Sequence, residues 1–190
     1  MQDIESKREK LLKLLDGERF RHSESVESEA ARLASIWGVA PDKARLAGLL
    51  HDSSRFMDPS QMLDLAKKLG LPFGPIEEIE PKLLHAGLSA HVAKKDFGVS
   101  DPEVLQAIER HTIGRPGMSL LDKIIYLADH IEPTRDYEGV IEIRELSSKD
   151  LNRAIVASTS AMIDYLVSKG YAIHPGTVET RNYYLLNPGK

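Results

Sequence analysis

Apolar residues recur along this chain three and four positions apart, the spacing that places them on one face of an α-helix. Gly, Pro and short polar residues separate these runs, as they do at helix ends. The pattern predicts helices over residues 4–15, from Ser23 or Ser25 to Trp37, and over 41–52, 60–69, 81–93, 102–111, 119–131, 138–147, 150–169 and 178–186. No run alternates polar and apolar positions as a half-buried strand does. We therefore expect an all-α protein with a helical-bundle fold.

The length and composition of the chain fit one globular domain. A chain of 190 residues can bury a continuous core, so we expect a single domain over residues 1–190. The composition, 42% hydrophobic and 28% charged, is typical of soluble proteins. The formal net charge of −4 disfavours nucleic acid as a partner, because its binding needs a broad basic surface, but allows a small phosphorylated ligand.

Two absences narrow the chemistry and the location. The chain has no cysteine, which excludes disulfides, thiolate metal sites and a cysteine nucleophile. No apolar run approaches the roughly 18 residues that span a bilayer, and the N-terminal residues are acidic. We therefore expect a cytoplasmic protein without membrane contact, and a homodimer stays open.

The first candidate for chemistry is the pair His51-Asp52, at the end of the apolar helix that Pro41 begins. Adjacent nitrogen and oxygen donors can bind one metal ion, and the carboxylate keeps a second oxygen for another. A buried Asp is costly unless it is paired, hydrogen-bonded or bound to a cation. A His-Asp pair also arises by chance, so its meaning depends on the other His and Asp residues.

Four further donors lie on separate predicted helices, mostly near helix ends, as ligands of a metal centre inside a bundle do. They are His22, His85, His111 and Asp129. A natural partition between two metal ions gives His22, His51, Asp52 and Asp129 to one ion and Asp52, His85 and His111 to the other. Asp52 would then bridge the ions, and Asp52 and Asp129 are the candidate catalytic carboxylates.

The remaining histidines fit structural roles better. A lone His near a helix end is more often a cap or a surface residue than a ligand, and we apply this to His91, His130 and His174. His130 adjoins Asp129 but points about 100° away from it on a helix. The spacing of the apolar residues on this helix favours Asp129, rather than His130, as the residue that faces the interior.

The order His, His-Asp, His, His, Asp resembles that of the HD-domain metal-dependent phosphohydrolases over nearly the whole chain. Residues 111–118 and 121–135 are closely similar to the YqeK subfamily. Two positions depart from its pattern: Ile113 stands where Thr is usual, and Ser53-Ser54-Arg55 replaces Tyr-Ala-Lys. Both departures fall on the expected substrate side of the site.

The resemblance implies a nucleotide-binding hydrolase that cleaves diadenosine tetraphosphate symmetrically to two ADP at a di-iron centre. Matched residue by residue, it carries over the same six ligands. Imidazole and carboxylate donors also suit Mn, Co or Zn, and the sequence does not choose among these metals. Two such ions about 3.5–4 Å apart would lower the pKa of a shared water, giving a metal-bound hydroxide, and hold the phosphoryl oxygens for in-line attack.

A polyphosphate carries more negative charge than two metal ions neutralise, so we expect basic residues near the ligands. The candidates for substrate contact are Arg55, Thr112, Lys123, Arg135 and Tyr171. For the basic residues, a solvated surface position is an equal alternative. Tyr171 could stack on a base, although packing is the commoner role for such a residue.

Two other functions stay open on the sequence alone. One is a different HD phosphohydrolase, acting on a nucleoside phosphate or a cyclic nucleotide. The other is a non-catalytic module that binds a metal or a nucleotide, which the complete set of ligands disfavours. The sequence does not identify a general acid for the leaving group.

Overall fold

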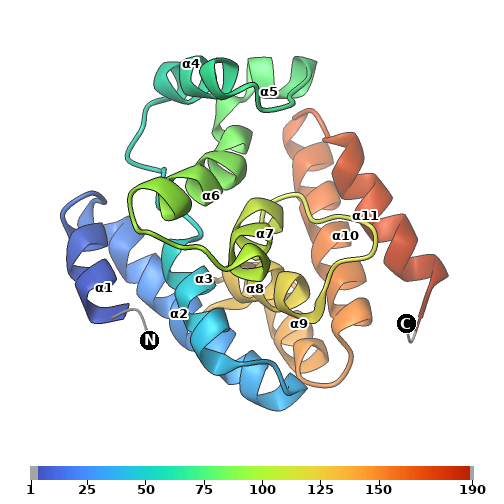
Figure 1. The fold of residues 1–190 in the computed structure, drawn as a ribbon. Coiled ribbons are helices and arrows are strands. Elements are labelled where there is room, and N and C mark those ends of the chain that lie inside the picture. Colours follow the sequence, from blue (N-terminus) through green and yellow to red (C-terminus); the bar gives the residue numbers. More distant parts are fainter. Residues whose placement is uncertain (1–3, 189–190) are drawn as a thin grey trace.

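The computed structural model describes residues 4–188, and every regular element in that range is a helix (Figure 1). The all-α prediction is confirmed. In chain order the elements are α1 (Ile4–Leu12), α2 (Gly17–Trp37), α3 (Pro41–Leu50), α4 (Pro59–Leu69), α5 (Pro75–Ile79), the 3₁₀ helix η1 (Pro81–Leu84), α6 (His85–Lys95), α7 (Pro102–Arg110), α8 (Leu120–Ile131), α9 (Val140–Ser147), α10 (Leu151–Lys169) and α11 (Pro175–Leu186). Among the described helices, none has the length and apolar character needed to cross a membrane.

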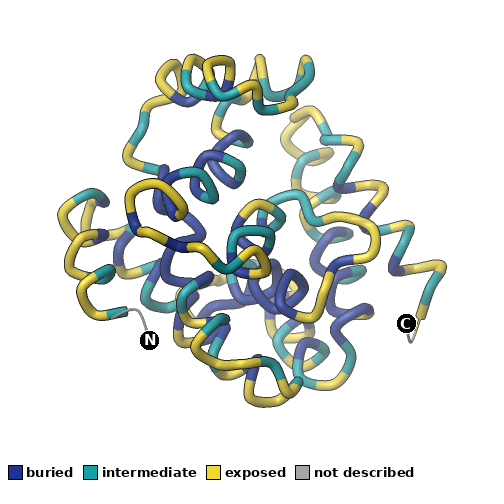
Figure 2. Tube along the Cα trace, viewed as in Figure 1, coloured by how far each residue is buried: buried dark blue, intermediate teal, exposed yellow. Residues whose placement is uncertain are grey.

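Helix α8 lies at the centre of the main core. Its residues from Leu121 to Ala128 are all buried, because α2, α3, α7 and α10 pack around it. The buried segments of these helices gather in the middle of the molecule (Figure 2). Asp129 follows directly on this buried stretch, so the packing of the core fixes where its carboxylate points.

The long helix α2 packs closely on α3 because small residues lie at their contact. Ala30 of α2 and Ala47 of α3 are fully buried. A Cβ atom on Gly48 of α3 would lie 2.9 Å from the Cα atom of Glu27, which leaves no room for a methyl group. This close approach brings His22, on α2, towards the residues that follow α3.

Helix α2 begins earlier than the sequence pattern predicts. The Asp16 side chain caps it by accepting hydrogen bonds from two backbone N–H groups at 3.1 and 2.9 Å. The predicted caps Ser23 and Ser25 are wrong, because Asp16 already satisfies the free N–H groups at the helix start. Helix α1 correspondingly ends at Leu12 rather than at residue 15. His22 therefore lies inside a regular helix, which holds it more rigidly than a helix start would.

The last helix also starts earlier than predicted, at Pro175 rather than at residue 178. The Nδ1 atom of His174 accepts a hydrogen bond from the backbone N–H of Gly176 at 3.0 Å, so His174 is the helix cap. Proline fits the first position of a helix because that position needs no N–H donor. The structural role expected for His174 agrees with this placement.

Helices α4 and α5 and the 3₁₀ helix η1 form a lobe at the top of Figure 1. It has a small apolar cluster of its own, in which Met62 and Ala66 pack with Leu84 and Leu88. The sequence pattern missed α5 because a five-residue helix is too short to show a periodic apolar face. The lobe leads directly into His85, the first residue of α6, and so helps to place that imidazole.

The contact between α2 and α3 gives a prediction about stability. Replacing Gly48 with Ala should lower the free energy of unfolding by about 1–3 kcal/mol, because the added methyl meets the backbone of α2. Urea unfolding followed by circular dichroism measures this change. Gly87→Ala on α6 is the matched control, since its Cβ would meet a Leu71 methyl at an ordinary 3.6 Å. Equal stability of the two variants would contradict the close packing.

Candidate metal centre

Six side chains from five helices or the residues directly after them meet in the interior of the bundle. They are the residues that the sequence predicts as metal ligands: His22, His51, Asp52, His85, His111 and Asp129. His51 and His111 directly follow the last residues of α3 and α7, and His85 opens α6. Side chains at helix ends can approach one point from several directions, which is how a bundle assembles such a cluster.

The first group of donors joins α2, the end of α3 and α8. The Nε2 atom of His22 lies 3.0 Å from Oδ1 of Asp129 and 3.2 Å from Nε2 of His51. One donor atom from each of these three residues lies within 4.8 Å of the others. Metal–ligand distances of about 2.0–2.2 Å place donor atoms at separations of this size, so the group is spaced for one cation.

Asp52 connects this group to a second one. Its Oδ2 atom lies 3.8 Å from Nε2 of His51, in the first group. Its Oδ1 atom lies 3.3 Å from Nε2 of His85 and 3.8 Å from Nε2 of His111. The two oxygens of a single carboxylate thus face imidazoles of both groups. This is the arrangement that a bridging carboxylate requires.

Hydrogen bonds fix which ring nitrogen carries the proton in three of these histidines. The Nδ1 atoms of His51, His85 and His111 lie 2.7, 2.5 and 2.7 Å from the backbone carbonyl oxygen three residues earlier. A carbonyl oxygen only accepts, so each Nδ1 carries the hydrogen and each Nε2 presents a lone pair.

These lone pairs face each other at short range. The Nε2 atoms of His85 and His111 are 3.0 Å apart, and two lone pairs at that distance repel. The hydroxyl of Thr112 lies 3.0 and 3.1 Å from the same two nitrogens but has one hydrogen to donate. A cation between the nitrogens removes the repulsion, so the donors present here fit bound metal ions.

The protonation states at the centre also suit cations. Burial lowers the pKa of both His85 and His111 to about 4. Burial alone would raise the pKa of Asp52, but the surrounding imidazoles outweigh it and bring the pKa to about 2. Against the same effect of burial, the hydrogen bond from His22 holds the pKa of Asp129 well below its usual range. Near neutral pH His85 and His111 therefore offer unprotonated nitrogens and the two carboxylates offer ionised oxygens, the forms that bind metals. Although burial lowers it, the pKa of His22 is raised overall by its hydrogen bond to Asp129, so a metal bound there would displace a proton.

His22 is held by a carboxylate rather than by a backbone carbonyl. The Oε1 atom of Glu132 lies 3.2 Å from Nδ1 of His22, and the Glu132 side chain is only 1% exposed. Thr134 donates to this carboxylate through its backbone N–H at 2.7 Å and its hydroxyl at 2.5 Å. A carboxylate that accepts a hydrogen bond from the other ring nitrogen of a ligand imidazole orients the ring and makes its metal-binding nitrogen more basic.

The segment that carries Glu132 is itself fixed by Arg144 of α9. The guanidinium of Arg144 donates to the backbone carbonyls of Ile131, Glu132 and Arg135 at 2.8–2.9 Å. The sequence pattern predicts a helix that ends at residue 131, so the contact of Glu132 with His22 was not predicted. The position of Glu132 three residues after Asp129, about one helical turn, is the signal that places it near the centre.

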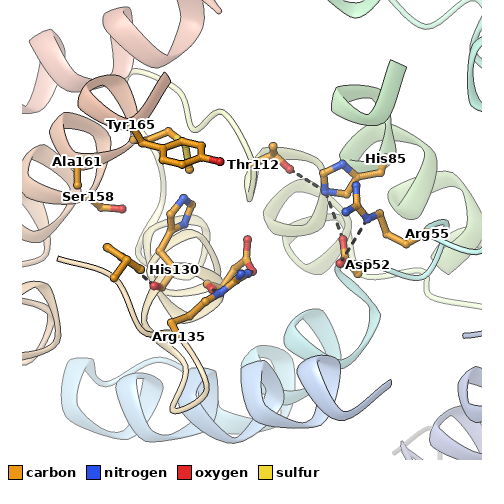
Figure 3. A pocket seen from close by; sticks show the side chains of 12 residues that line it. Asp52, Arg55, His85, Thr112, His130, Arg135, Ser158, Ala161 and Tyr165 are labelled. Carbon is orange, nitrogen blue, oxygen red and sulfur yellow. Dashed lines mark hydrogen bonds and ion pairs between the residues drawn. The ribbon is translucent and has the colours of Figure 1, made fainter. Parts of the chain in front are cut away.

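Two cavities open beside the centre. The smaller, of about 360 Å³, lies between the predicted ligands and α10, where Ala161 and Tyr165 form its far wall (Figure 3). The larger, of about 750 Å³, lies beside the start of α2 and is lined by charged residues that include Arg19 and Arg21. Four residues line both cavities: Asp52, Arg55, Arg135 and Tyr137. The cavities therefore meet at the centre and extend from it over different helices.

The structure brings three of the five predicted substrate contacts to these cavities. They are Arg55, Thr112 and Arg135. Lys123 lies elsewhere, buried in the core, and its Nζ atom donates to Oδ1 of Asn152 at 2.7 Å. Tyr171 is 60% exposed beyond the end of α10, and it lines neither cavity.

Most of the wall of the smaller cavity was not predicted from the sequence. Met162 and Tyr165 fall in the predicted helix over 150–169, with no functional role expected of them. Both line this cavity and are more than one-third exposed. His130 also lines it, and its Nδ1 atom donates to the backbone carbonyl of Tyr126 at 2.7 Å, so it has the structural contact expected of it.

Comparison with known proteins gives consistent matches. The family model described as HD domain matches residues 19–134. The symmetrical bis(5'-nucleosyl)-tetraphosphatase of Halalkalibacterium halodurans is 41% identical over 88% of this chain and 89% of its own. The protein of the same name from Bacillus subtilis is 36% identical over 87% and 88% of the two chains. The crystal structure of a predicted HD superfamily hydrolase involved in NAD metabolism from Clostridium acetobutylicum matches with a TM-score of 0.93 and 39% identity, covering 98% of each chain.

The contact between Glu132 and His22 predicts an effect on metal binding. Glu132→Gln keeps the shape of the side chain but removes its charge, so the metal position beside His22 should bind about 10-fold more weakly. Metal content after equilibration at a buffered free-metal concentration measures the change. Glu145→Gln is the control, because Glu145 is exposed on α9. Unchanged metal affinity in Glu132→Gln would show that the carboxylate does not support the ligand.

The buried histidines predict a pH dependence for the metal-free protein. In the unfolded chain His85 and His111 take up protons near pH 6.5, whereas in the folded chain they do so only near pH 4. The unfolded state thus binds more protons in this window, and the free energy of unfolding should fall as the pH falls from 6.5 to 4. His22 opposes this trend, because its hydrogen bond to Asp129 outweighs burial and raises its pKa. It is outnumbered, since burial also lowers the pKa of His51 and His130.

Urea unfolding of chelator-treated protein at pH 7 and pH 5 measures this trend. His85→Gln should make the free energy of unfolding less dependent on pH, because it removes one of the histidines whose pKa is lowered most clearly. Equal or greater stability at pH 5 than at pH 7 would contradict the assignment of buried neutral imidazoles.

Proposed function

This chain belongs to the HD-domain family, and we propose that it is an enzyme that hydrolyses diadenosine tetraphosphate symmetrically to two molecules of ADP. Two relatives that are 41% and 36% identical over most of both chains are named for this activity, which supports the proposal. The observation that carries the proposal is the position of Asp52, which faces both groups of imidazoles and lines both cavities.

In this proposal the residues of the centre divide between two metal ions. His22, His51 and Asp129 would hold one, His85 and His111 would hold the other, and Asp52 would contribute to both. Iron is the metal we propose, and Mn, Co or Zn would suit the same imidazole and carboxylate donors. When bound, such a pair lowers the pKa of a shared water and neutralises charge on the phosphoryl group under attack.

Two arginines lie where the tetraphosphate would cross the centre. Arg135 donates to Oδ1 of Asp129 at 2.7 Å, and its pKa is raised because that carboxylate outweighs burial, so it stays charged. The Nε atom of Arg55 lies 3.8 Å from Oδ2 of Asp52 and is buried without a hydrogen-bond partner among the described residues. A phosphoryl oxygen at the mouth of both cavities would satisfy that donor. We assign both arginines to charge neutralisation along the polyphosphate.

The smaller cavity suits one nucleoside of the substrate. Its lining offers flat and apolar surface from Tyr137, Met162 and Tyr165, while Thr112 and His130 add polar atoms. Base stacking on an aromatic ring provides affinity in a pocket of this kind. We therefore assign stacking to Tyr165 rather than to Tyr171, because Tyr165 forms part of the wall. The hydroxyl of Thr112, beside His85 and His111, is placed to orient the adjoining phosphate.

The products of the reaction test the proposal. Metal-loaded protein incubated with diadenosine tetraphosphate should give ADP as the sole nucleotide product, which chromatography of the mixture detects. Asp52→Asn should lose metal and lower kcat by about 100-fold or more, because it weakens both ligand groups at once.

Asp42→Asn is the matched control for this experiment, since Asp42 is exposed on α3, the helix that directly precedes His51 and Asp52. A mixture of ATP and AMP as the products would show that the cleavage is asymmetrical. Metal-loaded protein that leaves this substrate intact but hydrolyses a nucleoside triphosphate or a cyclic nucleotide would assign a different phosphohydrolase activity. Metal-loaded protein inert on all of them would favour a binding module.

A further inference from the structure

The two cavities beside the centre differ in chemistry, and a symmetrical cut requires both. Cleavage of a tetraphosphate into two equal halves places the middle phosphoanhydride at Asp52, with two phosphates and a nucleoside extending to each side. One half is accounted for by the cavity against α10. The other half needs space on a different side of Asp52, and the larger cavity beside α2 begins there.

We propose that this larger cavity binds the second nucleotide half through its phosphates, with little recognition of its base. The proposal rests on the proposed function. It adds which groups of the substrate the enzyme recognises. It predicts that one nucleoside of the substrate is selected by a stacking pocket while the other is free to vary.

The lining of the larger cavity supports binding of phosphate. Four arginines contribute to it: Arg19, Arg21, Arg55 and Arg135. One guanidinium group can donate two parallel hydrogen bonds to phosphate oxygens, and it stays charged at all relevant pH values. Arg21 is exposed on the outer side of α2, next in sequence to His22, so it extends the line of positive charge away from the centre.

The carboxylates in the same cavity make its charge depend on the metal centre. Three of them already have contacts in the structure: Asp16 caps α2 and pairs with Arg19 at 3.3 Å, Glu132 holds His22, and Asp52 lies among the imidazoles. Glu18 and Asp136 add further negative charge. With five carboxylates against four arginines, the protein alone gives a cavity with a slightly negative formal charge, and cations bound at the centre would make it positive.

The larger cavity offers a base little to stack on. Tyr137 is its one tyrosine among the described residues that line it, and that ring also belongs to the smaller cavity. Tyr165 and Met162, the flat and apolar groups of the site, line only the smaller cavity. Because recognition of a base needs stacking or hydrogen bonds to its edge, the second base would stay largely in solvent.

The first arm of the test varies the substrate. Wild-type enzyme is compared on diadenosine tetraphosphate, on a mixed tetraphosphate that carries one adenosine and one uridine, and on diuridine tetraphosphate. We expect kcat/KM for the mixed substrate within about 3-fold of that for the diadenosine compound, and a loss of about 10-fold or more when both adenosines are replaced. An equally large loss for the mixed substrate would overturn the inference, because it would mean that both bases are read.

The second arm varies the cavity. Arg21→Ala should raise KM for diadenosine tetraphosphate about 10-fold with a small change in kcat, more strongly at low ionic strength, and Arg21→Lys should restore part of the loss. The control is Arg153→Ala, which removes the same charge from an exposed position of α10 outside both cavities. Metal content reports that each variant keeps its centre.

The outcomes separate this inference from the proposed function. If the wild-type enzyme does not convert diadenosine tetraphosphate to ADP, the proposed function fails, and the inference with it. If the wild-type enzyme is active but Arg21→Ala keeps the KM of the control variant, the proposed function stands and the inference alone is overturned.

Discussion

The close approach of imidazole nitrogens around Asp52 is the constraint on which the rest of the structure depends. Backbone carbonyl oxygens accept hydrogen bonds from the Nδ1–H groups of His51, His85 and His111. The Nε2 lone pairs of these imidazoles therefore point at one another and at carboxylate oxygens. Such an arrangement is unfavourable in the protein alone, and cations make it favourable. Metal binding therefore stabilises a fold that brings these groups together from five separate elements, because the metal binds the folded chain and not the unfolded one.

The helices act as rigid supports for this cluster. Packing of α8 in the core fixes Asp129, and the few residues after it carry Glu132, which holds His22, and Arg135, which contacts Asp129. Arg144 fixes that segment from α9 through its backbone carbonyls. One short stretch thus supplies a candidate ligand, a supporting carboxylate and, in the proposed function, a cation for the substrate. It also borders both cavities, because Arg135 lines each of them.

The sequence predicted the helical fold and the convergence of six donors, because both follow from local patterns. Apolar periodicity indicates helices, and His or Asp residues near helix ends can point into the interior of the bundle. It misplaced the start of α2, because a cap depends on which of several polar residues reaches the free N–H groups, and Asp16 does so before Ser23. It could not place Lys123 or Tyr165, because the face of a helix that meets a cavity depends on neighbours distant in sequence.

Anomalous X-ray diffraction from crystals of the active, manganese-loaded enzyme tests whether two cations share Asp52. We expect two anomalous peaks about 3.5–4 Å apart. One should lie against His22, His51 and Asp129, the other against His85 and His111, with an oxygen of Asp52 bound to each. A single peak, or peaks away from this cluster in an active crystal, would contradict it.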